Sequence, residues 1–315
     1  MKPRNIVALA GGVGAARFLA GLVRVVPPES ISVVVNTGDD RVFYGVHVSP
    51  DVDIVTYTLA GRIDRTRGYG LAGDTSAVLD TLDSLGHETW FRLGDRDFAV
   101  CQHRTQALSQ GKGLAAIADD IRQRFGVATR ILPMSEAPCD TIVELSGGRR
   151  VHFEEYLARD GAPSDVEDVD LSAARAAKPA PGVLEAIEAA DVLLICPSNP
   201  VVSIGPILAV QGVRDAVVAA RAPVVAISPI IGGAPVKGPA DRLLRALGVE
   251  VSARGVAGLY RDLLDGYVLD TRDADQAADI EALGIQTRVL NTLMHDSAVA
   301  AQVARSALSL AGVTQ

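Results

Sequence analysis

Residues 5–17 read NIVALAGGVGAAR, and this stretch sets the expectation for the fold. The run NIVALA has the apolar character of a buried strand, the GGVG that follows interrupts it, and an apolar helical pattern begins at once over residues 15–26. A strand, a glycine turn and a helix start bring several backbone N–H groups and the positive end of a helix dipole to one point. The stretch therefore predicts a phosphate-binding loop at the end of a first βα unit.

Acidic residues gather after the next predicted strand, residues 31–35. The acidic and amide residues that follow this strand are Asn36, Asp39, Asp40, Asp51 and Asp53. Carboxylate oxygens are the ligands that Mg²⁺ takes, although the ion commonly uses only one or two protein carboxylates. A phosphate loop and carboxylates at neighbouring strand ends predict a nucleotide substrate with Mg²⁺. For any single aspartate the alternative is a solvated charge or a helix cap, and Asp51 is the expected cap.

The glycine loop alone is compatible with several kinds of site. No Gly-Lys-Ser/Thr sequence closes it, so it is not a Walker A loop. Gly12 and Gly14 fit the first two glycines of a dinucleotide fingerprint, but Arg17 stands at the third position. Arg17 would place a cation one helical turn from the phosphate, and the alternative is a plain tight turn with a solvated arginine. A side chain at Gly14 is expected to obstruct the approach of the loop amides to phosphate.

Composition excludes several classes of protein. The 315 residues are 48% hydrophobic, enough for one large α/β domain or two smaller ones. Only 4% are aromatic and the net charge is −8, which argues against a nucleic-acid partner and against an anionic membrane surface. No apolar run reaches the length of a membrane span. Cys101, Cys139 and Cys196 lack a metal-ligand spacing and predict reduced core residues of a cytoplasmic protein.

Strand-like and helix-like runs alternate along much of the chain. The strand-like runs are residues 6–10, 31–35, 141–145, 192–196 and 224–227. The helix-like runs are residues 15–26, 76–85, 114–125, 183–190, 213–220, 242–247 and 297–310. This alternation predicts an α/β fold with a doubly wound, mostly parallel sheet, in which ligands bind beyond the carboxyl ends of the strands.

The middle of the chain is less regular. Residues 132–153 contain short strand-like runs, and residues 146–148 (SGG) predict a hairpin turn between them. We therefore expect residues 1–60 and 181–315 to form the nucleotide-binding core. Residues 61–180 are expected to form an inserted smaller helical and hairpin region that caps the core.

Three further segments carry polar residues after predicted strands or in loops. Residues 91–97 (FRLGDRD) place Arg92 where a guanidinium can bind phosphate or stack on a flat ring; the alternative is an ion-pair network on a surface turn. Residues 196–206 and 228–233 follow predicted strands and are rich in Ser, Asn, Pro and Gly. This composition is typical of the walls of a ligand crevice, and the alternative is a pair of ordinary βα turns. No nucleophile with a base partner is evident, which favours direct in-line transfer.

Taken in order, these segments resemble one family. GGVGAARF, VVVNTGDD, SPDVDIVTYTLAG, WFRLGDRD, SNPVVSIGPIL and SPIIGGAPVKGPAD look like the signature segments of the 2-phospho-L-lactate transferases. The resemblance implies a Rossmann-like sheet with an inserted smaller region, and an enzyme of coenzyme F-420 biosynthesis. It implies two substrates, the deazaflavin Fo and a guanosine diphosphate ester of a small acid. The phospho-acid part would pass to the ribityl hydroxyl of Fo, with release of GMP and a requirement for Mg²⁺.

The resemblance also implies roles for individual residues. Those implied to hold the diphosphate are Gly12, Gly14 and Arg17. Those implied to surround the metal and the attacking hydroxyl are Asp39, Asp40 and Asp53. Asp53 and Arg92 would contact Fo. The remaining residues expected around the substrates are Asn36, Ser198, Asn199, Ser203 and Ser228.

Several alternatives stay open. The small acid can be phospholactate, phosphoenolpyruvate or phosphoglycerate, which share a carboxylate and differ by a small group. An NAD(P)-dependent dehydrogenase would explain the glycine loop, but neither the second acidic cluster nor Arg17. A nucleotide-sugar-binding regulatory protein would explain the loop without needing residues 93–97. We expect a homodimer, because cytosolic α/β enzymes with an apolar excess often form symmetric pairs.

Overall fold

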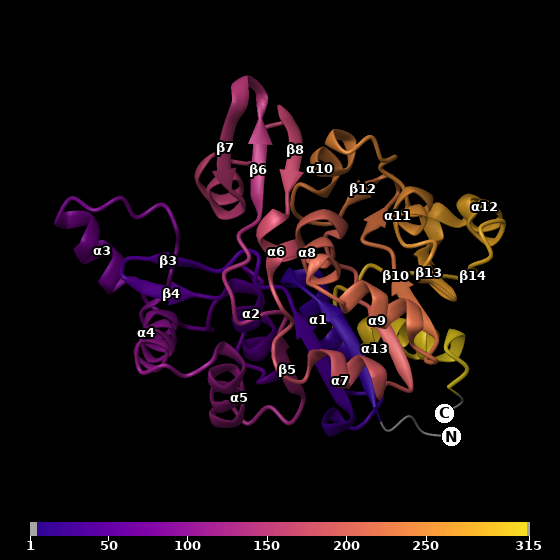
Figure 1. Cartoon of the computed structure of the whole chain (residues 1–315), viewed down its shortest axis with the longest axis horizontal. Helices are drawn as coiled ribbons and strands as arrows, with labels where there is room; N and C mark the ends of the chain where they lie inside the picture. The colour runs from indigo at the N-terminus through magenta and orange to yellow at the C-terminus, as the bar shows by residue number, and fades with distance from the viewer. Residues whose placement is uncertain (1–4, 314–315) are drawn as a thin grey trace.

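The computed structural model describes residues 5–313 and is built around one seven-stranded sheet (Figure 1). Its strand pairs are all parallel, in the order β14-β13-β10-β9-β1-β2-β5. The strands are β1 (Ile6–Ala10), β2 (Ile31–Val35), β5 (Arg130–Pro133), β9 (Val192–Ile195), β10 (Val224–Ile227), β13 (Gly266–Asp270) and β14 (Gln286–Leu290). When the seven strands are numbered by their order in the chain and counted from the β5 edge, the sheet has the order 3-2-1-4-5-6-7. Its first six strands follow the order of a Rossmann fold, 3-2-1-4-5-6. The predicted α/β fold is confirmed.

The direction of winding reverses at β1. This strand pairs with β2 on one side and with β9 on the other. In open α/β sheets the chain crossings on either side of such a point leave a crevice beyond the carboxyl ends of the strands. The glycine loop after β1 and the polar turns after β2 and β9 therefore meet at one place.

The strands separate two hydrophobic cores. Ile6, Ala8 and Ala10 belong to the core whose covering helices are α1 (Gly12–Leu22), α2 (Pro50–Leu59) and α13 (Ser297–Leu310). Val7 and Leu9 belong to the core of the opposite face, whose helices include α7 (Val183–Glu188), α9 (Val213–Ala219) and α11 (Ala253–Leu259). Because both faces are covered, the central strands are continuous apolar runs.

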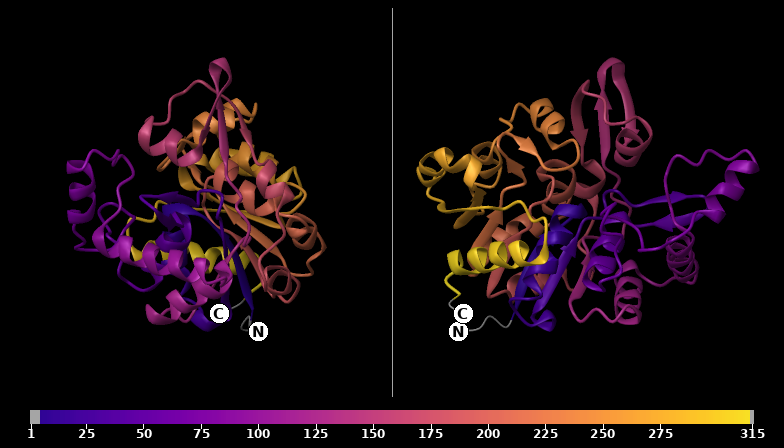
Figure 2. Two further views of the ribbon diagram at one scale, coloured as in Figure 1. Left: turned by 60° about the vertical axis from the view of Figure 1, so that its left-hand side comes forward. Right: turned by 180° about the vertical axis from the view of Figure 1, so that it is seen from behind.

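Between β2 and β9 the chain leaves the sheet twice. The first excursion contains β3 (Arg41–Phe43), β4 (Val46–Val48), α2, α3 (Ala77–Ser84), α4 (Asp95–Ser109) and α5 (Leu114–Arg124). The second contains the antiparallel sheet β7-β6-β8, made of β6 (Ile142–Leu145), β7 (Arg149–His152) and β8 (Val166–Asp170). Figures 1 and 2 show α3 and this small sheet projecting from the main body in different directions. The division at residues 61–180 stays a prediction, and β5 within that range is a strand of the central sheet.

The remaining elements are short and connect the larger ones. They are α6 (Ser172–Ala176), α8 (Gly205–Ala209), α10 (Ala240–Ala246), α12 (Ala277–Glu281), β11 (Ile230–Ile231), β12 (Ala234–Pro235), η1 (Pro28–Ser30), η2 (Ser146–Gly148), η3 (Glu155–Arg159), η4 (Pro200–Ile204) and η5 (Thr271–Gln276). Of these, η3 and η4 are single turns of π-helix, a form that is frequent at functional sites.

All the predicted helices are present, with small shifts in their bounds. The hairpin turn at residues 146–148 joins β6 to β7 as expected. The strand predicted at residues 141–145 exists as β6, but it belongs to the small antiparallel sheet. The elements that were not predicted include α4, α11, β5, β13 and β14. Helix α4 begins within the segment 91–97, for which a surface turn was the alternative.

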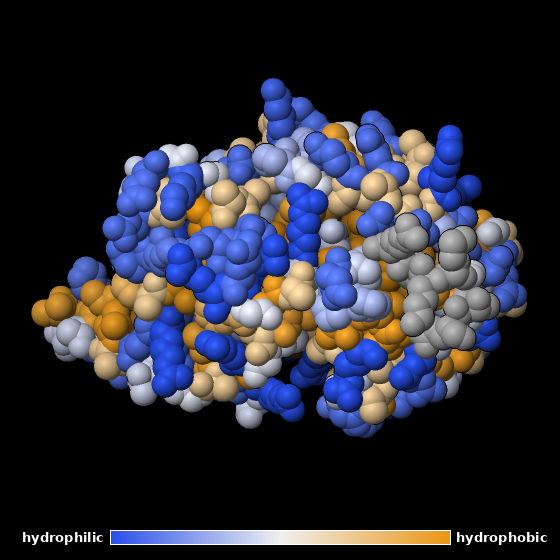
Figure 3. Space-filling view, turned by 90° about the horizontal axis from the view of Figure 1, so that it is seen from below, coloured by the Kyte–Doolittle hydropathy of each residue, from blue (hydrophilic) through white to orange (hydrophobic). Residues whose placement is uncertain are grey.

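The described chain has a mixed surface and no single helix of membrane-spanning character. On the face shown in Figure 3, hydrophilic and hydrophobic residues alternate in small groups. Within residues 5–313 no single helix has the length and apolar character to cross a bilayer, and one strongly bent pair, Pro200–Ala209 with Val213–Ala219, meets those two criteria together.

Candidate functional site

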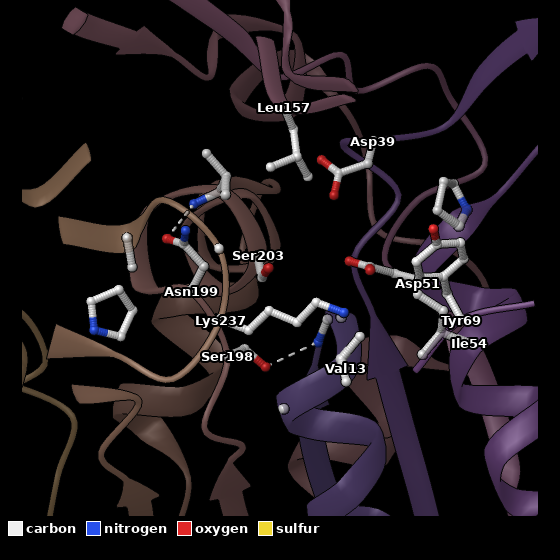
Figure 4. A pocket seen from close by; sticks show the side chains of 18 of the residues that line it. Val13, Asp39, Asp51, Ile54, Tyr69, Leu157, Ser198, Asn199, Ser203 and Lys237 are labelled. Carbon is white, nitrogen blue, oxygen red and sulfur yellow. Dashed lines mark hydrogen bonds between the residues drawn. The ribbon is translucent and has the colours of Figure 1, made fainter. Parts of the chain in front are cut away.

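A cavity of about 610 Å³ lies at the carboxyl ends of β1 and β9 (Figure 4). One part of its lining, called here the glycine-loop wall, consists of residues 11–14, Arg17 and the turn at 197–199. Another part, the aromatic wall, consists of residues 90–93 with Tyr57 and Asp97. The lining also includes four acidic residues, Asp39, Asp51, Asp53 and Glu154.

Most residues predicted for the site line this one cavity. They are Gly12, Gly14, Arg17, Asp39, Asp53, Arg92, Ser198, Asn199, Ser203 and Ser228. Asn36 and Asp40 do not line it. Figure 4 shows the carboxylates of Asp39 and Asp51 turned toward the open space, with Ser203 and Lys237 nearby.

The glycine loop brings the backbone of α1 against other elements. Gly12 has φ +72°, in the left-handed region that glycine adopts without penalty. A Cβ atom at Gly14 would collide with the backbone carbonyl oxygen of Pro197. Glycine at position 14 is therefore required by the packing of α1 on the turn after β9, in addition to any access for phosphate.

Two of the loop amides already have partners inside the protein. The N–H of Gly11 donates to Ser198 Oγ at 3.2 Å, and the carboxylate of Asp51 accepts from the backbone of Gly12. The first four N–H groups of a helix lack intrahelical acceptors. Within residues 5–313, those of Val13 and Gly14 therefore remain for a ligand.

Asp51 contacts the glycine loop and is not the cap of α2. The N-cap of α2 is Ser49, and Asp51 is the second residue of the helix. Asn36 Nδ2 donates to Asp51 Oδ2 at 2.9 Å and to the carbonyl of Val202 at 3.3 Å, while its Oδ1 accepts from Gly38 at 2.8 Å. Asn36 thus fixes the position of Asp51 from behind the cavity lining.

Three carboxyl groups, those of Asp39, Asp51 and Glu154, crowd one part of the cavity. Burial, together with the charges of Asp51 and Glu154, raises the pKa of Asp39 well above its ordinary value. Burial raises the pKa of Asp51 to about 6 and, with the charge of Asp51, that of Glu154 to about 8. Asp39 Oδ1 is buried and has no hydrogen-bond partner in the described chain. Such a group favours either protons or a bound cation.

The residues present fit a Mg²⁺ ion only as a partial cage. Within residues 5–313 no three His, Cys, Asp or Glu side chains are arranged to hold a metal by themselves. Mg²⁺ commonly takes one or two protein carboxylates together with water and phosphate oxygens. The unpartnered oxygen of Asp39, beside Asp51, fits that requirement. Asp40 accepts a hydrogen bond from Ser49 Oγ at 2.6 Å outside the lining, so its role as a ligand stays a prediction.

Asp53 reaches the cavity with its carboxylate already paired. Arg104 on α4 is 1% exposed, and its guanidinium donates to Asp53 Oδ1 and, at 3.1 Å, to the carbonyl of His47. Burial raises the pKa of Asp53, and the charge of Arg104 opposes that shift. Asp53 is therefore a fixed acceptor at the cavity surface, and a metal ion there would compete with Arg104.

The polar side chains after β9 and β10 hold their own turns. Asn199 Oδ1 accepts from Val201 at 2.9 Å at the start of η4. Ser228 Oγ donates to the carbonyl of Ile230 at 2.9 Å. Ser203 packs against the glycine loop, because a Cβ at Gly11 would lie 2.7 Å from its Cβ. These residues line the cavity as parts of rigid turns.

The aromatic wall offers a flat apolar surface beside an available cation. Arg92 is exposed, and no hydrogen bond or ion pair within residues 5–313 uses its guanidinium. Behind it the Phe91 ring stacks on Phe43, with centroids 3.9 Å apart and planes 6° from parallel. Asp97 is buried at the start of α4, and burial with the charge of Asp53 raises its pKa to about 7. The combination suits a planar ring with polar edges.

The sequence did not lead to a predicted role for four residues that line the cavity or hold one of its side chains. They are Glu154, Asp97, Lys237 and Arg104. Lys237 Nζ donates to the carbonyl of Arg67 at 2.8 Å and lies 5.6 Å from the centroid of Tyr69. Lys237 and Asp97 fall within two of the segments that resemble the family, so this resemblance could have indicated them as site residues. Glu154 and Arg104 had no such signal, because only the tertiary fold brings η3 and α4 to the cavity.

None of the cysteines supplies a nucleophile to the cavity. Cys101, Cys139 and Cys196 are buried and unpaired, and none lines the cavity. Burial raises the pKa of the Cys101 thiol to about 12 and raises those of the other two. Thiols in this state do not form the thiolate that attacks a substrate. The cysteines are therefore buried core residues, as the sequence predicts.

Comparisons with known proteins identify the family of the chain and relatives of its fold. The sequence model of the family described as 2-phospho-L-lactate transferase CofD matches residues 6–305. A phosphoenolpyruvate transferase from Kitasatospora aureofaciens is 50% identical over 313 residues, covering 98% of each chain. A 2-phospho-L-lactate transferase from Methanothermobacter thermautotrophicus is 41% identical over 292 residues, covering 92% of this chain and 93% of its own. A solved UPF0052 family protein from Bacillus halodurans, 20% identical, shares the fold with a TM-score of 0.64 over 98% and 99% of the two chains.

Proposed function

Since this chain belongs to the 2-phospho-L-lactate transferase CofD family of enzymes, we propose that it joins the phospho-acid part of a guanosine diphosphate ester to the deazaflavin Fo. The ribityl hydroxyl of Fo is the acceptor, GMP is released, and the reaction serves coenzyme F-420 biosynthesis. The observation that carries this proposal is the single cavity. It holds a phosphate-type glycine loop, crowded carboxyl groups and an aromatic wall with an exposed arginine.

The glycine-loop wall is suited to the diphosphate. The amides of Val13 and Gly14 lie at the start of α1, where the helix dipole favours negative charge. Arg17 and Lys237 line the same cavity, and the charge of Arg17 contributes to a lowered pKa of Lys237, after burial. Two neighbouring cations at this point favour a doubly charged group over a neutral one.

The aromatic wall is suited to the deazaflavin ring. A guanidinium such as that of Arg92 can stack on a flat ring and hydrogen-bond to its polar edge at the same time. Asp53 presents an acceptor held by Arg104. In this proposal that carboxylate receives the hydroxyl proton of the ribityl chain when both substrates are bound.

The transfer balances without a covalent enzyme intermediate. The ribityl oxygen forms a bond to the phosphorus that carries the acid, and the bond from that phosphorus to the GMP oxygen breaks. The hydroxyl proton passes to Asp53, and the electron pair leaves with GMP. Asp39 and Asp51 would hold Mg²⁺, which would offset the negative charge that builds on the phosphate oxygens.

The acid is proposed to be phosphoenolpyruvate. The relative at 50% identity is named a phosphoenolpyruvate transferase, whereas the relative at 41% is named a 2-phospho-L-lactate transferase. The preference rests on these names and on the difference in identity. The cytoplasmic location and the homodimer remain predictions from the sequence.

The test is a reaction of the purified protein with Fo and the guanosine diphosphate esters of enolpyruvate and of lactate, with and without Mg²⁺. Mass spectrometry should find GMP and the Fo-linked phospho-acid only with Mg²⁺, and faster with the enolpyruvyl ester. No product from either ester would contradict the proposed reaction. Product formed equally well in the presence of a chelator would contradict the metal.

A matched pair of variants sharpens the metal assignment. Asp39→Asn removes the negative charge of the carboxyl group whose Oδ1 is unpartnered in the described chain, and turnover should fall by about 100-fold or more while the protein stays folded. Asp140→Asn changes an exposed aspartate outside the cavity and should keep full turnover. Full activity of Asp39→Asn at low Mg²⁺ would remove Asp39 from the site.

A further inference from the structure

The turn between β3 and β4 departs from a local preference. Phe43 pairs with Val46, so Tyr44 and Gly45 form a two-residue hairpin turn. Both have positive φ, +52° at Tyr44 and +81° at Gly45, as a type I′ turn requires. Such turns favour Asn, Asp or Gly at the first position, because a bulky side chain at positive φ is strained. A tyrosine at this position needs a reason outside the hairpin.

That reason is a pair of hydrogen bonds to the aromatic wall. The Tyr44 hydroxyl donates to the carbonyl oxygen of Phe91 at 2.9 Å and accepts from the N–H of the same residue at 3.1 Å. One side-chain oxygen thus satisfies both backbone groups of Phe91. The neighbouring Phe43 stacks on the Phe91 ring. The hairpin therefore holds Phe91 by its backbone and by its side chain.

Phe91 is the residue before Arg92, and the chain is fixed again shortly after it. Asp95 accepts from the N–H of Val78 at 2.9 Å and from the hydroxyl of Thr75 at 2.5 Å. Arg92 lies between the two fixed points, Phe91 and Asp95. Within the described chain no hydrogen bond holds its guanidinium. The place of Arg92 in the cavity therefore depends on the backbone that carries it.

We propose that Tyr44 is a positioning residue that tethers residues 90–92 and so fixes Arg92 in the cavity. Strained conformations of non-glycine residues persist where the surrounding structure determines them, and they cluster at binding sites. Here the strain at Tyr44 is offset by the two bonds to Phe91. The identity of the ligand that Arg92 meets rests on the proposed function, whereas the tether is a property of the protein alone.

The test uses Trp90, the only tryptophan of the chain, which adjoins the tethered residue. Tyr44→Phe removes the hydroxyl and keeps the ring. In the ligand-free protein, acrylamide should then quench Trp90 fluorescence more strongly than in the parent. The KM for Fo should rise about fivefold, a loss on the scale of one or two hydrogen bonds. The kcat and the KM for the guanosine ester should stay as they are, whereas a general structural defect would change them too.

Tyr44→Asn is the second variant, because it supplies a residue type that the turn prefers. It should raise the KM for Fo as Tyr44→Phe does, without lowering the melting temperature. Unchanged Trp90 quenching in Tyr44→Phe would overturn the tether. Increased quenching with an unchanged KM for Fo would overturn its link to Arg92. If the parent does not bind Fo, the proposed function fails, and Trp90 quenching alone decides the tether.

Discussion

The glycine-loop wall of the cavity is built from backbone, whereas the aromatic wall is built from side chains. In the first, the glycine loop and the turn after β9 bring two stretches of main chain together, with Gly14 against the carbonyl of Pro197. The loop amides are the groups proposed to bind phosphate. These stretches directly follow β1 and β9, which are neighbours in the sheet. Little beyond the sheet itself is needed to form this wall.

The aromatic wall depends on contacts between parts far apart in the chain. Within this wall, Tyr44 reaches Phe91 across 47 positions. Beside it, Arg104 reaches Asp53, whose charge acts on Asp97 of the wall, across 51 positions. Each of these contacts uses a specific polar side chain in a buried or half-buried setting. This difference implies that substitutions in the glycine-loop wall affect binding by disturbing the fold. Substitutions in the aromatic wall should instead affect binding by displacing single side chains.

The largest expected effect comes from breaking the buried ion pair that supports Asp53. Arg104→Met leaves the Asp53 carboxylate buried without its partner, which should lower the free energy of unfolding by about 3–5 kcal/mol. Urea unfolding measures the change. Adding Asp53→Asn to this variant should recover part of the loss, because no uncompensated charge then remains.

The matched control is Arg124→Met, which breaks an exposed pair with Asp120 at 2.8 Å on helix α5. Exposed pairs contribute about 1 kcal/mol or less, so this variant should stay near the parent. Equal losses for the two arginines would show that burial does not set the strength of the Arg104 pair.

A methyl group in the glycine-loop wall should have the next largest effect. Gly14→Ala places a Cβ against the carbonyl of Pro197, and the backbone must shift. The expected loss is about 1–3 kcal/mol of unfolding free energy. Binding of nucleotide and of Fo should fall together, unlike the selective loss of phosphate binding that the sequence alone suggests.

Gly258→Ala serves as the control, because this glycine lies inside α11 with no atom within 4 Å of an added Cβ. Alanine is favoured over glycine in a helix by up to about 1 kcal/mol, so stability should stay equal or rise. A Gly14→Ala protein that is as stable as the parent but loses only nucleotide binding would restore the simpler phosphate-access explanation.

The same contrast explains what could be predicted from the sequence. The glycine-loop wall was predictable, because a buried strand, a glycine turn and a helix start are local patterns. The parallel, doubly wound sheet was also predictable from the alternation of β and α runs, whereas the order of its strands was not predicted. In contrast, β14 is an edge strand whose polar and partly exposed residues hide its pattern.

Helix α4 was missed because of what it buries. Its buried residues are Asp97, Cys101, Arg104 and Ala107, so two charged side chains face inward. A search for apolar periodicity counts those positions as surface. Glu154 was equally hidden, since its neighbours in the cavity, Asp39 and Asp51, are about a hundred residues earlier in the chain. The local pattern carries no trace of contacts that tertiary packing creates.

The third prediction concerns Asp97 in the aromatic wall, tested without metal. Burial, with the charge of Asp53, raises its pKa to about 7, above the value of an unfolded aspartate. The folded state therefore holds this proton more tightly. The stability that Asp97 contributes is full below about pH 4 and is lost as the pH rises through about 7, with a slope of up to ~1.4 kcal/mol per pH unit.

Asp97→Asn cannot lose a proton, so its unfolding free energy should depend less on pH between 5 and 8. Chemical denaturation at several pH values in the presence of a chelator measures the slope. Glu167→Gln, at an exposed position on β8, should keep the slope of the parent. A slope in Asp97→Asn equal to that of the parent would place the titrating group elsewhere.

The smallest expected effect is on substrate affinity. It distinguishes the contribution of the positive charge of Arg92 from that of its planar guanidinium. Arg92→Lys keeps the cation but loses the planar fork that stacks on a ring, so the KM for Fo should rise about fivefold, roughly 1 kcal/mol. Arg92→Ala should raise it further. Neither change should alter the KM for the guanosine ester, because in the proposed function its diphosphate binds at the glycine-loop wall.

Arg96→Ala is the control within the same segment, because Arg96 is exposed and does not line the cavity. It should leave both KM values unchanged. Loss of affinity for the guanosine ester in Arg92→Ala would show that the two walls share one substrate group. Equal KM values for Fo in Arg92→Lys and the parent would show that Arg92 acts as a point charge, and the tether at Tyr44 would then need only to hold a charge near the ring.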